Sequence, residues 1–375
     1  MVAAGGAEAW AVLERARKRR EAGLPIFPLA IGQPEEPPHS AIVQAAIQAL
    51  HAGRTRYSPL LGEPALRQAV GRARGCAPAR VAVLPGAQHA LLAALSLILG
   101  EGDEVVTPDP FYATYPTTVA AAGGRLVPVP MDGPDFALDV DRLAAAVGPR
   151  TRAILVNTPA NPTGRALAAP AWQRLAQLCT AHGLWLVADE VYGHLMHGRP
   201  FASALTHGPA EATIVIDSLS KSHGMTGFRL GWAIAPERLL PAFEEWSAAA
   251  LFGVAQFVQD AGVAALALPE AELAPYRTGF ARRARLALER LKSIPGLDVA
   301  PPDGGMFLFV DVRRIAASDV AFALDLLEEE GVAVMPGSGF GAAGCGFVRL
   351  SLTPSEPVLA AALDRLARFV ARRRP

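Results

Sequence analysis

The sequence is poor in lysine and cysteine and carries no net charge. Lysine and arginine together number 35, as do aspartate and glutamate, so no long-range field draws nucleic acid or an anionic membrane to the protein. Three cysteines, Cys76, Cys179 and Cys345, lie far apart and lack CxxC spacing, which argues against a disulfide framework or a zinc site. We expect ordinary buried or partly buried thiols, no metal, and small-molecule partners.

Long apolar runs are also missing. The longest, from Ala90 to Leu99, has about half the length that a bilayer crossing needs. The first residues, Met1–Trp10, lack the basic-then-apolar pattern of a secretory signal. We therefore expect no contact with a membrane and a cytoplasmic location.

Hydrophobic residues, in contrast, occur in patterns that predict regular structure. Apolar residues at helical spacing from Ala7 to Glu21 predict a short amphipathic arm, which Gly23 and Pro25 end. Further on, short runs rich in Val, Ile and Leu alternate with helical stretches. These runs span residues 81–84, 104–107, 125–129, 153–157, 184–188 and 213–216. They lack polar alternation, so they predict a mostly parallel sheet with helices on both faces.

The pattern changes near Glu272, where one long helix is predicted to run until Pro295-Gly296. Its apolar face is Tyr276, Phe280, Ala284, Leu288 and Leu291, and the arginines expected mostly on other faces are Arg282, Arg283, Arg285 and Arg290. Strands are expected at residues 305–310 and 347–350. These elements predict a second, smaller α+β unit.

Length and composition favour two domains in an α/β protein, because 375 residues with 51% hydrophobic content can bury one large and one smaller core. We expect an N-terminal arm with part of the small domain over residues 1–45. The large domain is expected over residues 46–270 and the small C-terminal domain over residues 271–375.

In an open parallel sheet, chemistry collects at the loops that follow the carboxyl ends of strands. Small residues in the loop over residues 85–90 allow backbone N–H groups at a helix start to approach an anion, although a tight turn explains them equally. The loop over residues 107–112 places aromatics on a proline-stiffened turn. A ring there could stack on a planar cofactor or simply pack in the core.

Two further loops carry polar side chains. Prolines and a glycine around Asn161 fix a bend that lets its amide donate to a ligand oxygen, and a structural turn is the alternative. Asp189 follows a strongly apolar run, where an unpaired carboxylate is costly to bury. A protonated ring nitrogen would supply a partner, and capping of the next helix is the alternative.

The loop over residues 217–231 is the most informative. It places Lys221 among hydroxyls and glycines just after a strand, whereas the other two lysines, Lys18 and Lys292, lie on charged helices where arginine would serve equally. Only lysine, not arginine, can form an imine and then act as a proton-transfer base once its pKa is lowered. A structural or phosphate-binding lysine is the alternative.

In order and spacing these loops resemble those of fold-type I pyridoxal-phosphate enzymes, the class I/II aminotransferases in particular, over nearly the full length of the chain. The most specific matches are Asn161–Gly164, Asp189–Tyr192 and Ser218–Lys221 with Arg229. The resemblance implies a large domain that binds pyridoxal 5'-phosphate and a smaller α+β domain.

The resemblance also implies a role for each matching residue. Lys221 would hold the cofactor covalently, Asp189 would keep the pyridine nitrogen protonated, and Tyr112 would stack on the ring. Asn161 and Tyr192 would hydrogen-bond the phenolic oxygen. The groups that would bind the phosphate are the backbone of Ala87 and Gln88 with Ser218, Ser220 and Arg229.

Three further matches concern the partner subunit and the substrate. Tyr57 matches a tyrosine that the neighbouring subunit contributes, which implies a homodimer with shared active sites. Arg349 matches the arginine that grips the substrate α-carboxylate, a task suited to a bidentate guanidinium. Gly32 matches a segment that covers the substrate, and Asn161 is expected to bind the substrate as well as the cofactor. A surface ion pair for Arg349 and a plain turn at Gly32 are the alternatives.

The implied reaction is a ping-pong transfer of an amino group from an L-amino acid to a 2-oxo acid such as pyruvate or 2-oxoglutarate. The chain looks most like arginine–pyruvate transaminases, which implies a basic or guanidino-bearing donor. The segments that carry this likeness are residues 7–10, 220–223, 252–253, 256–260 and 302–307.

Two other functions stay open. The same cofactor residues serve lyases and other amino-acid-modifying enzymes, because the reaction depends on which substrate bond lies perpendicular to the ring. A ligand-sensing regulator built on this fold would need a DNA-binding extension, which neither the N-terminal arm nor the balanced charge provides.

Overall fold

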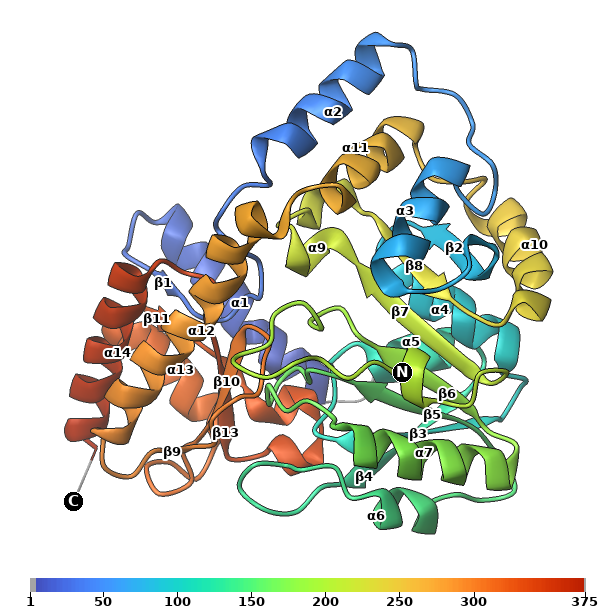
Figure 1. The fold of residues 1–375 in the computed structure, drawn as a ribbon. Helices are drawn as coiled ribbons and strands as arrows, with labels where there is room; N and C mark the ends of the chain where they lie inside the picture. Colours follow the sequence, from blue (N-terminus) through green and yellow to red (C-terminus); the bar gives the residue numbers. More distant parts are fainter. Residues whose placement is uncertain (1–4, 374–375) are drawn as a thin grey trace.

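The computed structural model describes residues 5–373, with side chains from Ala11 onward. Its centre is a seven-stranded sheet with the strand order β2-β8-β7-β6-β5-β3-β4 (Figure 1). The strands are β2 (Val81–Leu84), β3 (Glu104–Asp109), β4 (Arg125–Pro130), β5 (Thr151–Asn157), β6 (Trp185–Asp189), β7 (Thr213–Ser218) and β8 (Gly231–Ile234). Within this sheet β8 runs antiparallel to β2 and β7, and the other pairs are parallel.

The six predicted strand runs all lie in this sheet, which confirms the α/β fold with a mostly parallel sheet. The added strand, β8, has no counterpart among the predicted runs. It is short and begins at Gly231, a residue type that weakens a strand pattern. Glycine is needed there because a Cβ would lie 2.6 Å from the Ala87 backbone nitrogen.

Both faces of the sheet are buried. In β5, Ile154 and Val156 point into one core while Ala153 and Leu155 point into the other, as the two-residue period of a strand requires. The first core is covered by α2 (Ser40–His51), α3 (Pro64–Arg74), α6 (Val140–Ala145), α7 (Ala169–His182), α8 (Ala204–His207) and α11 (Gln256–Leu266). The second is covered by α4 (Ala87–Ile98), α5 (Tyr115–Ala121) and α10 (Leu240–Ala250).

A smaller unit packs beside the large sheet (Figure 1). Its four-stranded antiparallel sheet has the order β12-β13-β10-β9, and β1 pairs with β11 in parallel. The strands are β1 (Phe27–Pro28), β9 (Asp298–Val299), β10 (Phe307–Asp311), β11 (Val332–Ala333), β12 (Met335–Pro336) and β13 (Phe347–Ser351). The helices are α1 (Gly5–Glu21), α12 (Glu270–Lys292), α13 (Asp319–Glu330) and α14 (Glu356–Ala371).

The predicted arm, long helix and two late strands are therefore present, but one of the arginines lies differently. Arg283 of α12 is buried rather than on an outer face. Its guanidinium lies over the Phe280 ring, 4.4 Å from the centroid, and donates to Glu36 at 2.7 Å. Burial is tolerated because a carboxylate from another segment pairs with the charge, which helical spacing does not reveal.

We propose that the two units are the two domains. The buried side chains of the smaller unit come mainly from residues 12–30 and 280–370, and those of the large unit from residues 42–265, which supports the predicted division. Ile42 belongs to the large core, so we place the first boundary at the start of α2, a few residues before position 45.

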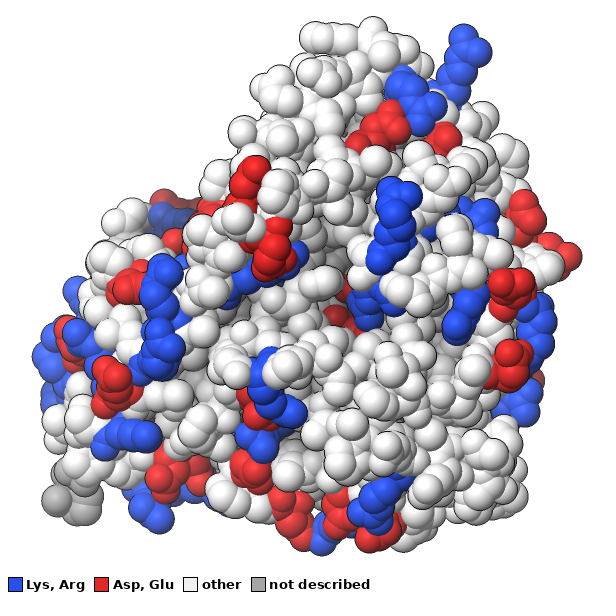
Figure 2. All heavy atoms as spheres, viewed as in Figure 1, with Lys and Arg blue, Asp and Glu red and all other residues white. Residues whose placement is uncertain are grey.

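Basic and acidic side chains are interspersed over the face drawn in Figure 2. The projecting α2 is an exception, because its sequence contains no Lys, Arg, Asp or Glu and its tip is white in the same view. Three of its apolar side chains are exposed, Val43 by 37%, Ile47 by 39% and Leu50 by 45%. This surface is suited to contact with another protein surface.

The expectations about thiols, metals and membranes have separate outcomes. Cys179 is buried and Cys76 half-buried, but Cys345 is exposed because it ends a short turn at the surface before β13. Over residues 5–373 no cluster of His, Cys, Asp and Glu is placed to hold a metal ion. No helix in the same range combines the length and apolar character needed to cross a bilayer.

Candidate active site

The predicted loops follow the carboxyl ends of the parallel strands and so come together at one end of the sheet. This end faces the smaller unit (Figure 1). A cleft lies there. The predicted residues that line it are Ala87, Gln88, Tyr112, Asn161, Asp189, Tyr192, Ser218, Ser220, Lys221 and Arg229. Gly32 and Arg349 line an adjoining hollow together with Lys221.

One end of the cleft is an anion cradle at the start of α4. Gly86 precedes the helix with a φ of 84°, which favours glycine, and an added Cβ would lie 2.5 Å from the Arg229 Nη2, so the guanidinium would have to shift. No side-chain cap hydrogen bond occupies the first N–H groups of α4, which begins at Ala87. A helix N-terminus beside a guanidinium and the hydroxyl groups of Ser218 and Ser220 is suited to a phosphate group.

Lys221 lies in α9 (Leu219–Ser222), the single turn that follows β7. Its Nζ donates to the carbonyl oxygen of Gly32 at 2.7 Å. Burial lowers the pKa of the Lys221 amine to about 8, and the nearby charges of Arg349 and Arg229 act in the same direction. The amine is therefore far easier to deprotonate than an ordinary lysine.

Asp189 ends β6 at the inner wall of the cleft and is buried. Its Oδ2 accepts a hydrogen bond from the Tyr115 hydroxyl at 2.9 Å. Burial raises the pKa of this carboxyl group to about 6, while the bond from Tyr115 opposes the rise. Asn157 supports the same strand end, because its Nδ2 donates to the Asp189 carbonyl oxygen and its Oδ1 accepts from the Asn161 backbone.

A buried ion-pair network lies behind Asp189. Arg74 of α3 pairs with both Glu190 and Asp217, and the side chains of all three are at most 8% exposed. The arginine compensates two carboxylates next to Asp189 that would otherwise be buried without a partner. The network ties the ends of β6 and β7 to α3 and so holds the site's inner wall.

Arg349 of β13 is a buried cation whose only partners are neutral. Its Nη1 donates to Asn161 Oδ1 at 2.9 Å and its Nη2 to the Ala30 carbonyl oxygen at 2.6 Å, while its Nε is buried without a partner. The rings of Phe307 and Phe340 lie 4.1 and 4.7 Å from the guanidinium carbon. Burial lowers the pKa of Arg349 to about 10, and no carboxylate among the described residues pairs with it. Such a group is suited to bind an incoming carboxylate.

Two tyrosines complete the walls. Tyr112 packs edge-on against Tyr115, with centroids 5.6 Å apart, and Tyr192 packs edge-on against Phe307 at 5.8 Å. Burial raises the pKa of both Tyr112 and Tyr192, so both hydroxyls stay protonated and can donate hydrogen bonds.

Tyr57 is the one predicted residue that lines neither the cleft nor the adjoining hollow. Its side chain is 80% exposed, and its ring packs edge-on against Phe252 at 4.9 Å. Within a single chain it therefore has no contact with the other predicted residues.

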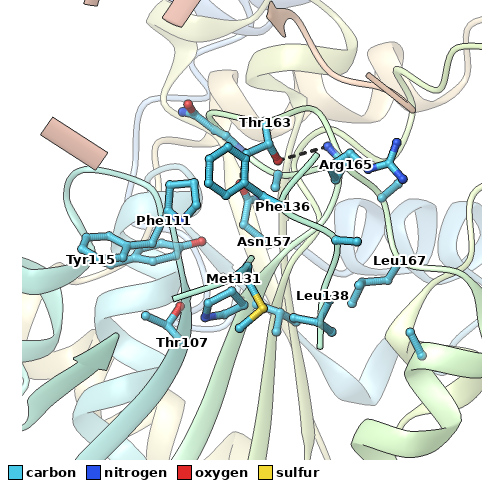
Figure 3. Close-up of a pocket in the computed structure, with 18 of the residues that line it drawn as sticks. Thr107, Phe111, Tyr115, Met131, Phe136, Leu138, Asn157, Thr163, Arg165 and Leu167 are labelled. Carbon is cyan, nitrogen blue, oxygen red and sulfur yellow. Dashed lines mark hydrogen bonds between the residues drawn. The ribbon is translucent and has the colours of Figure 1, made fainter. Parts of the chain in front are cut away.

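A second pocket shares Asn157 and Asn161 with the cleft (Figure 3). Its apolar wall includes Phe111, Met131, Phe136, Leu138 and Leu167. Tyr115 also lines it, and its hydroxyl points toward Asn157 in the figure. This pocket backs the active-site cleft, and Tyr115 connects the two through its bond to Asp189.

Sequence reasoning missed Tyr115, Asn157 and Arg74. A signal for Tyr115 was available, because it lies three residues after Tyr112, just beyond the loop predicted to present an aromatic ring. For Arg74 there was none, since it is one of several arginines near the end of α3 and nothing local marks it as buried.

Comparison with known proteins decides the family. Residues 25–366 match the family described as aminotransferase class I and II. The chain belongs to this family. It is 41% identical to the arginine–pyruvate transaminase of Pseudomonas aeruginosa over 374 residues, which cover 98% of this chain and 95% of that protein. It is 35% identical to the aspartate aminotransferase of Geobacillus stearothermophilus, with 96% and 95% covered.

The fold of this aminotransferase agrees with that of solved relatives. A single mutant of the Thermus thermophilus aspartate aminotransferase superposes with a TM-score of 0.92 at 34% identity, covering 98% of this chain and 97% of the other. The predicted family, the fold-type I architecture and the prediction of an enzyme are thus confirmed. Class I and II aminotransferases use pyridoxal phosphate and act on amino acids and 2-oxo acids.

Proposed function

We propose that this aminotransferase transfers the amino group of an L-amino acid to a 2-oxo acid, with pyridoxal 5'-phosphate bound in the cleft at Lys221. The observation that carries the proposal is the placement of Lys221 between the buried carboxylate of Asp189 and the unpaired guanidinium of Arg349. With its pKa lowered to about 8 by burial, the amine has a neutral fraction near neutral pH. It can then act as a nucleophile and as a proton acceptor.

The residues of the cleft fit the cofactor. The start of α4, with Ala87 and Gln88, receives the phosphate beside Ser218, Ser220 and Arg229. Asp189 is a buried carboxylate without a cation partner among the described residues, and a protonated pyridine nitrogen would supply one. When bound, pyridoxal phosphate provides an aldehyde that takes up the amino group and a ring that accepts the electron pair left at the substrate Cα.

The protein's own groups then have separate tasks. Arg349 binds the substrate α-carboxylate and so orients Cα toward Lys221, whose Nζ removes the Cα proton. Asn161 accepts from Arg349 through its Oδ1, so its amide N–H groups, which lie beside the Tyr192 hydroxyl, would be the donors to the cofactor's phenolic oxygen together with Tyr192. Gly32 covers the site, and its carbonyl oxygen accepts a hydrogen bond from the Lys221 amine.

A homodimer is part of the proposal. Tyr57 and Phe252 form an exposed aromatic pair, and the nearby α2 exposes Val43, Ile47 and Leu50. A second copy packed on this surface would bury the apolar side chains and carry Tyr57 to the neighbouring cleft.

Two measurements test the proposed function. Borohydride reduction of the cofactor-loaded enzyme followed by peptide mapping should place the cofactor on Lys221, and an adduct on Lys18 or Lys292 would refute the assignment. Mixing the enzyme with single amino acids should convert the bound cofactor and release the matching 2-oxo acid. Release of pyruvate and ammonia without a 2-oxo acid acceptor would instead identify a lyase.

A further inference from the structure

The hollow that holds Arg349 and Lys221 extends past them toward solvent. Its wall includes the apolar Leu13 from α1, Ile31 and Ala113 and the uncharged polar Gln33, Thr114 and Thr226, and its floor includes Met335 and Phe340. Ile31 is 53% exposed at the mouth, while the floor residues are buried. A side chain that projects from a substrate Cα held between Arg349 and Lys221 has this hollow beside it.

The charged side chains that line the hollow already have tasks in the proposed reaction. Among the described residues that line it, Lys221 and Arg349 are the charged ones, and none is acidic. The carboxylates on the neighbouring segment are held elsewhere: Glu36 pairs with Arg283, and Glu35 accepts from the Ser355 backbone. Among residues 11–373, whose side chains the structure describes, the wall therefore offers no carboxylate to a guanidinium and no spare cation to a second carboxylate.

Among the described residues, the surface around Tyr57 provides no unpaired carboxylate to the hollow either. The aromatic ring of Phe252 continues it, and the nearby carboxylates of Glu63 and Asp260 are both paired with Arg54. If the proposed dimer brings Tyr57 to the partner's cleft, it brings an aromatic surface with it.

We propose that this hollow is the side-chain subsite and that it takes an uncharged, largely apolar amino-acid side chain. The inference rests on the proposed function and differs from the basic donor that the sequence resemblance implies. Each methylene buried against the wall tightens binding about fourfold. A charged tip loses hydration without gaining a partner.

Binding of acids that lack the amino group tests the subsite without any transfer step. The probes are 4-methylpentanoate and 3-phenylpropanoate for apolar side chains, butanedioate for an acidic one and 5-guanidinopentanoate for a basic one. In calorimetric titrations of the cofactor-loaded enzyme, the two apolar acids should bind at least about tenfold more tightly than the two charged ones.

Equal or tighter binding of 5-guanidinopentanoate would overturn the inference. Tighter binding of butanedioate would also overturn it and would direct attention to Arg56, the cation next to Tyr57 in the sequence. Selective binding of the apolar acids with no amino acid acting as a donor would leave the subsite standing and refute the proposed function.

A charge placed at the mouth provides a second test. Ile31→Glu puts a carboxylate at an exposed position of the wall, and Ile31→Gln is the uncharged control of the same size. The glutamate should improve binding of 5-guanidinopentanoate relative to 4-methylpentanoate by about three- to fivefold, as expected for an exposed ion pair, and the glutamine should not. Identical ratios in the two variants would show that the side chain of the bound acid does not reach Ile31, which would refute the assignment of the hollow.

Discussion

Lys221 and Gly32 are 189 positions apart in the sequence, yet the Lys221 Nζ donates a 2.7 Å hydrogen bond to the Gly32 carbonyl oxygen. The bond joins the turn after β7 to the segment that leads from the N-terminal helix into the large unit. The amine is buried near two arginines, Arg349 and Arg229. Burial lowers its pKa to about 8, and the charges of the two arginines act in the same direction.

This environment predicts the pH dependence of Lys221 reactivity in the cofactor-free protein. Because the pKa is lowered, the neutral amine is present from about pH 8 upward, and reactivity should fall about tenfold per pH unit below that value. Trinitrobenzenesulfonate labelling followed by peptide mass spectrometry measures it. Lys18 and Lys292 serve as references within the same molecule, and a Lys221 profile that matches theirs would contradict the lowered pKa.

Asp189→Asn should leave the cofactor bound but slow the half-reaction by about 100-fold or more, because a neutral amide cannot hold a proton on the pyridine nitrogen. Asparagine keeps an acceptor for the Tyr115 hydroxyl, so the local packing is preserved. Calorimetry of cofactor binding and stopped-flow absorbance of the half-reaction separate the two effects. A rate close to that of the wild type would exclude this role for Asp189.

Tyr115→Phe removes the hydroxyl that stabilises the ionised form of Asp189. The pKa of Asp189, raised to about 6 by burial, should then rise further, by about one unit for the loss of a hydrogen bond to a charge. Because the ionised form is the one that would pair with a protonated pyridine nitrogen, the pH below which the cofactor-free protein loses affinity for pyridoxal phosphate should move upward. Tyr112→Phe, which removes a hydroxyl that does not bond to Asp189, is the control, and an equal shift in both variants would argue against the specific bond.

Gly86→Ala should weaken binding of pyridoxal phosphate and of inorganic phosphate, because the new Cβ would displace the Arg229 guanidinium from the start of α4. Gly183→Ala is a matched control: Gly183 also has a positive φ, of 63°, but nothing lies within 4 Å of its added Cβ. Both variants should lose unfolding free energy, about 1 kcal/mol for Gly183→Ala, where the backbone is left-handed helical, and on the order of 1–3 kcal/mol for Gly86→Ala, where the ψ of 165° lies in a region nearly exclusive to glycine. Affinities measured by calorimetry should differ between them, and equal affinities would rule out the cradle.

Mixed dimers test whether Tyr57 acts across the interface. Tyr57→Phe chains and Lys221→Ala chains each lack a different half of a composite site, so a mixed dimer has one site with both defects and one with neither. Activity should recover above that of either parent, provided that Tyr57→Phe alone is impaired. Verified mixed dimers without recovery, or a fully active monomer, would show that the site is not shared.

Local sequence determined a large part of this protein. Apolar runs such as residues 153–157 predicted the parallel sheet because a strand buried on both faces must be apolar throughout. Lys221 could be singled out because it is one of three lysines and follows a strand among hydroxyls. These features depend on residues close together in the chain, which is why they can be read without a structure.

Tertiary structure alone decided how these parts meet. That Tyr115 holds Asp189, that Arg283 is buried on Glu36, and that Arg349 lacks a carboxylate partner all depend on which elements pack together. Neither helical spacing nor residue type contains that information, because the cost of burying a charge is set by groups that lie far away in the sequence. The chemical character of the substrate hollow was decided in the same way, by walls from α1, the segment around Ile31 and the small sheet.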